Sequence, residues 1–98
     1  MAKRISWSNN AKYERRETLE YWFKRNGNKF FSRKLAKEFR VTARQIHEHN
    51  YLGHPTDFEN VRVIVCEVYF IFYEIKKDLI EIFKIWDGRR NPEELELK

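Results

Sequence analysis

The residues best suited to chemistry in this chain are arginines at the two ends of a run of predicted strands. Arg62 stands at the start of one apolar segment, and Arg89 and Arg90 follow the last one. A guanidinium stays charged at any working pH, and its planar fork can meet two phosphate oxygens at once. A sheet that turns Arg62 and Arg89 toward the same open concavity would therefore form a candidate anion site.

Both arginines also have structural interpretations. Arg62 can pair with Asp87 or Glu74 if these acids lie in neighbouring strands. The segment Asp87-Gly88-Arg89 can form a turn that is closed by its own ion pair and ends the sheet. The phosphate-binding and structural interpretations both stay open on sequence alone.

Two tyrosines add a second candidate feature. Tyr69 and Tyr73 are four residues apart in a predicted strand, so their rings lie on the same face. There they can stack on bases or pack against the rest of the protein, and packing is favoured.

The histidines and the single cysteine do not indicate a metal site. His47 and His49 are two residues apart on a predicted helix and point to different sides, and His54 has no cysteine or carboxylate at ligand spacing. Cys66 lies in an apolar run, so we expect a buried, inert thiol. We expect no metal ion and no other cofactor.

Three short apolar runs must position these side chains. They cover Val61 to Cys66, Val68 to Ile75 and Leu79 to Trp86, and one to three polar residues separate them. Runs of this length that are rich in Val, Ile, Phe and Tyr are typical of consecutive antiparallel strands joined by tight turns. Residues 87–92 close this predicted meander.

The first half of the chain predicts a short strand and two helices. Residues 3–8 alternate polar and apolar side chains, and Ser8 can cap a helix from Ala11 to Arg25. Gly27 predicts a left-handed stop before a second helix from about Lys29 to His49. The apolar residues recur at helical spacing. They are Ala11, Leu19, Trp22 and Phe23 in the first helix and Phe31, Leu35, Phe39, Ala43 and Ile46 in the second.

These elements predict an α+β fold in which an antiparallel helical hairpin packs on one face of a mostly antiparallel sheet. The 98 residues suit one domain, 1–98. Residues 51–60 read as an irregular connection, because Gly53, Pro55 and Asp57 disfavour a regular element. Residues 93–98 form either a last helical turn or a frayed tail.

Charge divides the chain unevenly. Residues 1–50 hold thirteen Lys or Arg against five Glu, whereas residues 51–98 hold seven against ten acids. The basic half is where an acidic partner or a phosphate backbone would be drawn, although helical surfaces also need charge for solubility. No apolar run approaches the roughly 20 residues of a membrane span, so we expect a cytoplasmic protein without a membrane partner.

The order and spacing of these features resemble the RelE/ParE superfamily, the toxins of bacterial type II toxin-antitoxin modules. The resemblance rests on the opening Ile5-Ser6-Trp7-Ser8, Pro55 in the loop, Arg62, the strand Tyr69-Phe70-Ile71-Phe72-Tyr73-Glu74-Ile75, and the stretch from Asp78 to Pro92. It implies the predicted fold, an antitoxin that wraps the toxin, and one of two activities. One group cleaves messenger RNA without a metal, often on the ribosome, and the other poisons DNA gyrase.

For RNA cleavage, the resemblance assigns phosphate neutralisation to Arg62 and Arg89 and leaves Glu59, Tyr73 and Lys77 as candidate acid-base groups. Arg90 and Tyr69 are further candidate nucleic-acid contacts, and Trp86 and Trp22 are candidate antitoxin contacts. The chain departs from the nucleases at Phe70, where many have Arg or Lys, and at Trp86-Asp87, where many have His. An Asp beside Arg89 would be paired and acidic.

Three hypotheses follow. The first is a growth-arresting toxin that cleaves messenger RNA and is neutralised by an antitoxin encoded beside it, through an acidic amphipathic segment laid across the helices. The second is a poison that binds gyrase through its helical hairpin. The third is a basic RNA-binding module, or a toxin without activity that only binds its antitoxin.

Overall fold

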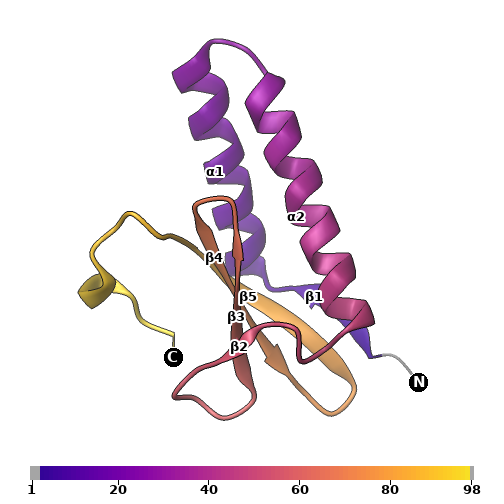
Figure 1. Ribbon diagram of the computed structural model, residues 1–98. Helices are drawn as coiled ribbons and strands as arrows, with labels where there is room; N and C mark the ends of the chain where they lie inside the picture. The colour runs from indigo at the N-terminus through magenta and orange to yellow at the C-terminus, as the bar shows by residue number, and fades with distance from the viewer. Residues whose placement is uncertain (1–2, 98) are drawn as a thin grey trace.

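The computed structural model describes residues 3–97, which form a five-stranded sheet with two helices on one face (Figure 1). In chain order the elements are β1 (Arg4–Trp7), α1 (Asn9–Asn26), α2 (Phe30–Glu48), β2 (His54–Pro55), β3 (Val61–Cys66), β4 (Tyr69–Ile75), β5 (Leu79–Asp87) and a 3-10 turn, η1 (Pro92–Glu94). The predicted α+β class, helical hairpin and three-stranded meander are confirmed.

The sheet brings the first and last strands together. Its order is β1-β5-β4-β3-β2, and β1 runs parallel to β5 from the pair Arg4 and Leu79 to the pair Trp7 and Ile82. All other pairs are antiparallel. A parallel neighbour needs a long connection, and here the helical hairpin and strands β2 to β4 lie between β1 and β5 in the chain.

The ends of α1 follow from two predicted residues. The Ser8 hydroxyl accepts a hydrogen bond from the Ala11 N–H at 3.0 Å, which caps the first turn. Gly27 adopts the left-handed conformation with φ of 71°, and its N–H donates to the Phe23 carbonyl. Neither helix in the described residues combines the length and apolar character that a bilayer span needs.

The main core lies between the helices and the sheet. The α2 stripe is confirmed, because Leu35, Phe39, Ala43 and Ile46 are buried against the sheet and Phe31 packs beside them. The α1 stripe is shorter than predicted, since Phe23 is 41% exposed. The hairpin extends past the end of the sheet (Figure 1), so the last turn of α1 has no sheet surface to cover.

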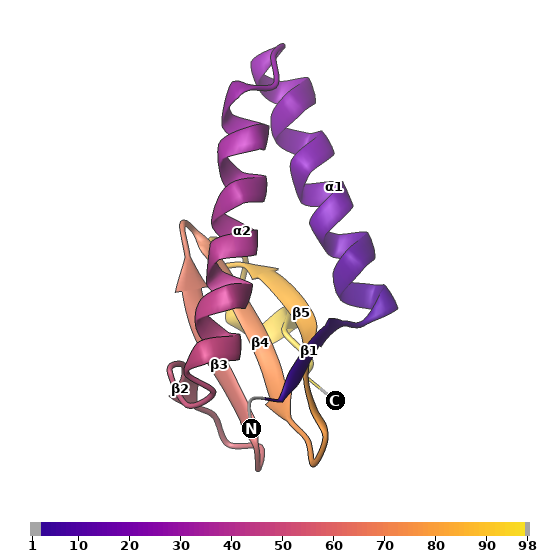
Figure 2. The ribbon, with the colours of Figure 1, turned by 90° about the vertical axis from the view of Figure 1, so that its right-hand side faces the viewer.

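A smaller core lies on the opposite face of the sheet. Val61, Phe72 and Trp86 are buried there, and Leu95 and Leu97 of the C-terminal segment pack against this cluster. Figure 2 shows this segment behind the sheet, with the helices in front. The last described residues thus form one helical turn and cover apolar side chains.

The prediction that residues 51–60 contain no regular element is wrong at one point. His54 and Pro55 form the two-residue strand β2, which pairs with Val63 and Arg62 at the edge of the sheet. A proline has no N–H to donate, and an edge strand tolerates this because one side of it needs no partner.

Candidate functional site

Arg62 is held by the backbone of the loop that precedes β2. Its Nη1 donates hydrogen bonds to the carbonyl oxygens of Tyr51, at 3.1 Å, and Gly53, at 2.6 Å. Its guanidinium carbon also lies 4.9 Å from the centre of the Tyr51 ring. These contacts fix the loop against β3, and Asp87, one of the two predicted partners of Arg62, pairs with Arg89 instead.

Tyr73 is a structural residue at the same end of the sheet. Its side chain is fully buried, and its hydroxyl accepts a hydrogen bond from the Gly53 N–H at 2.9 Å and donates one to the Asn50 carbonyl at 2.9 Å. Burial raises the pKa of this phenol above its usual range, despite the Gly53 hydrogen bond and the nearby Arg62. To transfer its proton to another group, the hydroxyl would have to give up its hydrogen bond to the Asn50 carbonyl.

The raised pKa makes Tyr73 a source of alkaline instability. The pKa of Tyr73 in the folded protein lies above its unfolded value of about 10. The protonated phenol therefore contributes its full stabilisation of the fold below pH 10, and this stabilisation is lost as the pH rises from there through the folded pKa. Tyr73→Phe should flatten this loss and lower the free energy of unfolding at pH 7 by about 1–3 kcal/mol, because the Gly53 N–H loses its acceptor. Urea titrations from pH 7 to 11 test this. Tyr51→Phe, at an exposed ring, is the control, and an unchanged alkaline slope in Tyr73→Phe would contradict the assignment.

The other candidate acid-base groups do not gather around a phosphate site. Glu59 is exposed and lines a hollow of about 210 Å³ together with Arg62 and Tyr51. Lys77 is exposed in the turn between β4 and β5 and does not line that hollow. Only Glu59 is therefore near Arg62 on an open surface.

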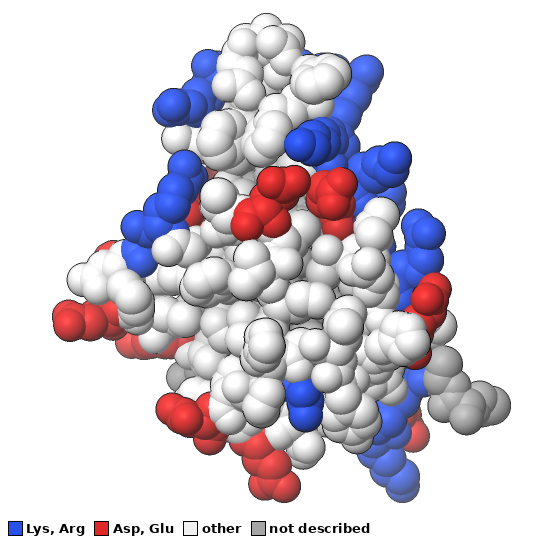
Figure 3. Space-filling model, viewed as in Figure 1, with Lys and Arg blue, Asp and Glu red and all other residues white. Residues whose placement is uncertain are grey.

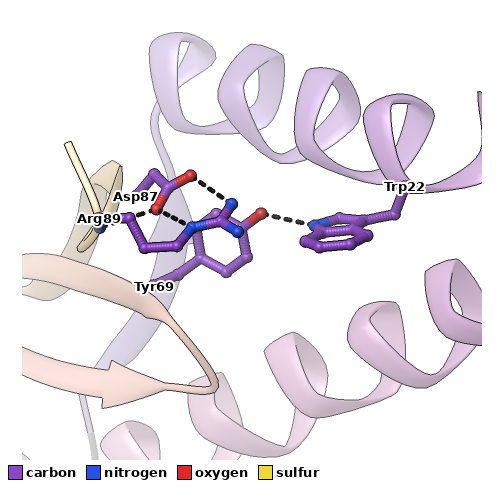
Figure 4. Close-up of polar contacts among 4 residues, drawn as sticks. All are labelled: Trp22, Tyr69, Asp87 and Arg89. Atoms are coloured by element: carbon purple, nitrogen blue, oxygen red, sulfur yellow. Dashed lines mark hydrogen bonds and ion pairs between the residues drawn. The ribbon is translucent and has the colours of Figure 1, made fainter. Parts of the chain in front are cut away.

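Arg89 lies at the other end of the sheet and is paired with its own strand terminus. Its Nε and Nη2 donate to the two carboxylate oxygens of Asp87 at 2.9 and 2.7 Å (Figure 4). The hydrogen bonds of this pair lower the pKa of Asp87 below its usual range and raise the pKa of Arg89 above its usual range. The predicted local ion pair is confirmed, and it occupies the Nε–Nη2 edge of the guanidinium, one of the two edges with which the group can meet two phosphate oxygens.

Tyr69 and Trp22 connect this ion pair to α1. The Trp22 indole N–H donates to the Tyr69 hydroxyl at 2.6 Å, and the Arg89 guanidinium carbon lies 5.6 Å from the Trp22 ring centre (Figure 4). Tyr69 is only 4% exposed and packs edge-on against Phe39. Because the Tyr69 ring is buried in the core, it offers no open face on which a base could stack. The same burial raises the pKa of the Tyr69 phenol.

The expectation that Arg62 and Arg89 converge is wrong. Arg62 is paired across the ladder with Tyr73, whereas the strand end that precedes Arg89 is paired with Tyr69. These partners are four residues apart on β4, which corresponds to about 13 Å along the strand. The two arginines also line different hollows.

Trp86, a candidate antitoxin contact, is 4% exposed and belongs to the cluster that Leu95 and Leu97 cover. The Arg90 guanidinium carbon lies 4.3 Å from its ring centre. In this conformation Trp86 presents almost no surface to a partner, and Arg90 is engaged with it.

A basic groove lies between the two helices and is here called the interhelical groove. It consists of an upper hollow of about 440 Å³ and a lower hollow of about 450 Å³, and Arg15 lines both. Figure 2 shows the two helices side by side above β1, and Arg4, Ile5 and Trp7 of β1 line the lower hollow. Apolar side chains contribute to its lining, namely Leu19, Phe23, Ile5, Trp7 and Ala43, and its cations are Lys12, Arg15, Arg16, Lys29, Arg33, Arg4, Arg40 and Arg44.

The charge balance predicts that residues 1–50 attract an acidic partner, but it does not identify which of these residues line the groove. A usable signal was present in α2, where Arg33, Lys37, Arg40 and Arg44 recur at spacings of four, three and four and so share one face. The Arg15 guanidinium also stacks 4.4 Å from the Trp7 ring centre, a contact between α1 and β1 that no local pattern predicts.

Comparison with known proteins places this architecture in a family. A family model described as the ParE toxin of the type II toxin-antitoxin system, parDE, matches residues 5–92. A solved structure described as a chromosomal ParDE TA system from P. aeruginosa superposes with a TM-score of 0.77, covering 88% of this chain and 96% of that chain at 14% identity. At that identity the likeness supports the fold alone, and no curated protein matches the sequence. Because the family match spans nearly all of the described residues, the chain belongs to the ParE toxin family of type II toxin-antitoxin systems.

Proposed function

We propose that this toxin poisons DNA gyrase and does not cleave RNA. The observation that carries the proposal is the separation of Arg62 and Arg89, each of which is engaged with protein groups at its own end of the sheet. Metal-free RNA cleavage needs cations and proton donors around one phosphate. The chain instead commits these side chains to loop and turn structure.

The acid-base groups support the same proposal. Tyr73 is buried with both hydroxyl hydrogen bonds made, and Lys77 lies in a turn away from the Arg62 hollow. Glu59 and Arg62 together provide one carboxylate and one guanidinium that is already bonded to carbonyl oxygens. This pair lacks a second proton-transfer group and a free phosphate clamp.

An antitoxin partner follows from the family, and the interhelical groove is the surface that suits it. The groove has an apolar lining and many cations on its rim, with Glu20 as its single acid among the described residues. An amphipathic helix with acidic flanks would place its apolar stripe on Leu19 and Trp7 and its carboxylates beside the arginines. A helix of about 19 residues, like α2, would run about 28 Å along it.

The proposal is tested by expressing the toxin without its antitoxin. Growth should stop with induction of the DNA-damage response and intact transcripts, and the purified protein should trap gyrase on cleaved plasmid DNA. Arg89→Ala should keep this toxicity, because Arg89 serves the Asp87 turn. Cleaved transcripts with undamaged DNA, lost on Arg89→Ala in a folded protein, would instead support the nuclease. Normal growth at confirmed expression would indicate a toxin without activity.

A further inference from the structure

The tip of the helical hairpin carries a surface with no role in the fold of the sheet. We define the tip surface as Phe23, Lys24, Arg25, Lys29, Phe30 and Arg33, all of which are exposed. Three of them, Phe23, Lys29 and Arg33, also line the upper hollow of the interhelical groove. Figures 1 and 2 show the hairpin rising beyond the turn between β3 and β4. The tip thus reaches further from the sheet than any other region of the hairpin.

The tip carries a dense positive charge without compensation. Residues 21–37 contain six Lys or Arg and no Asp or Glu. Of these six, only Lys34 forms an ion pair within residues 3–97, with Glu67 at 3.9 Å. In Figure 3, Lys and Arg side chains flank both sides of the hairpin, and the acidic side chains lie lower on the molecule. Such a charged end attracts a polyanion.

Two exposed phenylalanines lie among these cations. Phe30 is 81% exposed and Phe23 is 41% exposed, and the Lys29 ammonium lies 5.6 Å from the Phe23 ring centre. The core does not need Phe30, because α2 begins its buried stripe at Phe31 and Leu35. A large apolar ring held in water at a projecting turn is a feature of contact surfaces.

The backbone and its neighbours hold the tip in one shape. The left-handed Gly27 closes α1 through its hydrogen bond to Phe23, and the Ser32 hydroxyl donates to the Leu19 carbonyl at 3.1 Å. The Trp22 and Phe31 rings pack edge-on with their centres 4.8 Å apart. A partner would meet a preformed surface, which lowers the entropic cost of binding.

We propose that the tip surface binds double-stranded DNA. The cations of both helix ends would neutralise backbone phosphates, and the Phe30 ring would press against sugars or enter a base step from the minor groove. This contact goes beyond gyrase poisoning and antitoxin binding. In a poison of gyrase it would place the toxin on the DNA that the enzyme holds.

The same residues fit other polyanions less well. A membrane-surface helix needs a continuous apolar face, whereas the apolar stripes of α1 and α2 pack on the sheet and on each other. An acidic amphipathic peptide needs an apolar trough, and most of the apolar lining of the interhelical groove, namely Leu19, Ile5, Trp7 and Ala43, lies outside the tip surface. The tip offers isolated rings among cations on a convex end, and this arrangement suits a phosphate backbone.

Fluorescence anisotropy with a labelled 20-base-pair duplex tests the proposal at 50 to 200 mM salt. Four tip cations predict a slope of log K against log salt of about −3.6, and Lys29→Ala with Arg33→Ala should make it about two units shallower. Phe30→Ala should weaken binding about tenfold and leave the slope unchanged, because it removes a ring and no charge. The matched control is Lys76→Ala with Lys77→Ala, two exposed cations in the β4–β5 turn.

The opposing results are equally specific. No duplex binding by the folded protein at 50 mM salt would overturn the proposal. So would a salt slope that becomes as shallow in the Lys76 and Lys77 control as in the Lys29 and Arg33 variant. Binding to anionic vesicles but not to the duplex would overturn it as well and assign the tip to a lipid surface. Since duplex binding is measured without gyrase, its failure leaves the gyrase test untouched, and the reverse also holds.

Discussion

Reversing two arginines of the interhelical groove, Arg40→Glu with Arg44→Glu, is expected to weaken antitoxin binding about 100-fold. Both side chains are exposed, line the groove and form no ion pair within residues 3–97. Each replacement turns an attraction for an acidic segment into a repulsion, and a 100-fold change corresponds to about 2.7 kcal/mol in total. The fold should survive, because the groove holds many cations and the new carboxylates relieve their mutual repulsion.

Calorimetric titration with the cognate antitoxin measures this effect. Growth should also fail to recover at an antitoxin dose that rescues cells expressing the unmodified toxin. Lys76→Glu with Lys77→Glu makes the same change in net charge in the β4–β5 turn and should leave the affinity within about threefold. Equal losses in both variants would show that net charge, and not the groove, drives binding.

Gly53→Ala is expected to destabilise the fold by about 3 kcal/mol. An added Cβ would lie 2.8 Å from the Val63 carbonyl oxygen and 2.9 Å from both Cε1 and the hydroxyl oxygen of Tyr73. The Gly53 N–H and carbonyl are also the partners of Tyr73 and Arg62, so any shift of this loop disturbs both contacts. Urea unfolding should show a lower midpoint with an unchanged m-value.

Gly27→Ala is the comparison that separates crowding from backbone strain. Gly27 has φ of 71°, and a Cβ there would have no heavy atom within 4 Å. Its cost should be about 1 kcal/mol, the penalty for a side chain in the left-handed region. If Gly27→Ala proves as costly as Gly53→Ala, the crowding around Gly53 is not the cause.

The local patterns predicted the elements well because each rests on short-range physics. The α2 stripe and the Ser8 and Gly27 caps are all found. The predicted ends of β3, β4 and β5 are each within one residue of the observed ones. Side-chain periodicity and backbone conformation determine these features inside a window of a few residues.

The candidate site could not be predicted in the same way, because it depends on register. The strand sequences do not specify that Arg62 faces Tyr73 while Asp87 faces Tyr69, and this offset alone separates Arg62 from Arg89. The carbonyl partners of Arg62 lie in an irregular loop with no periodic signal. The packing of Trp7 against Arg15 likewise joins two elements through tertiary structure.

The pairing of β1 with β5 has a consequence for synthesis on the ribosome. Strand β1 pairs with Leu79 to Ile82, so it must wait until more than 70 further residues have been translated. Chains are made at about 5–20 residues per second, which is slow compared with the microseconds of hairpin formation. The nascent protein can therefore close its sheet only after residues 79–82 have been synthesised, and an antitoxin that is already present can bind the toxin as it folds.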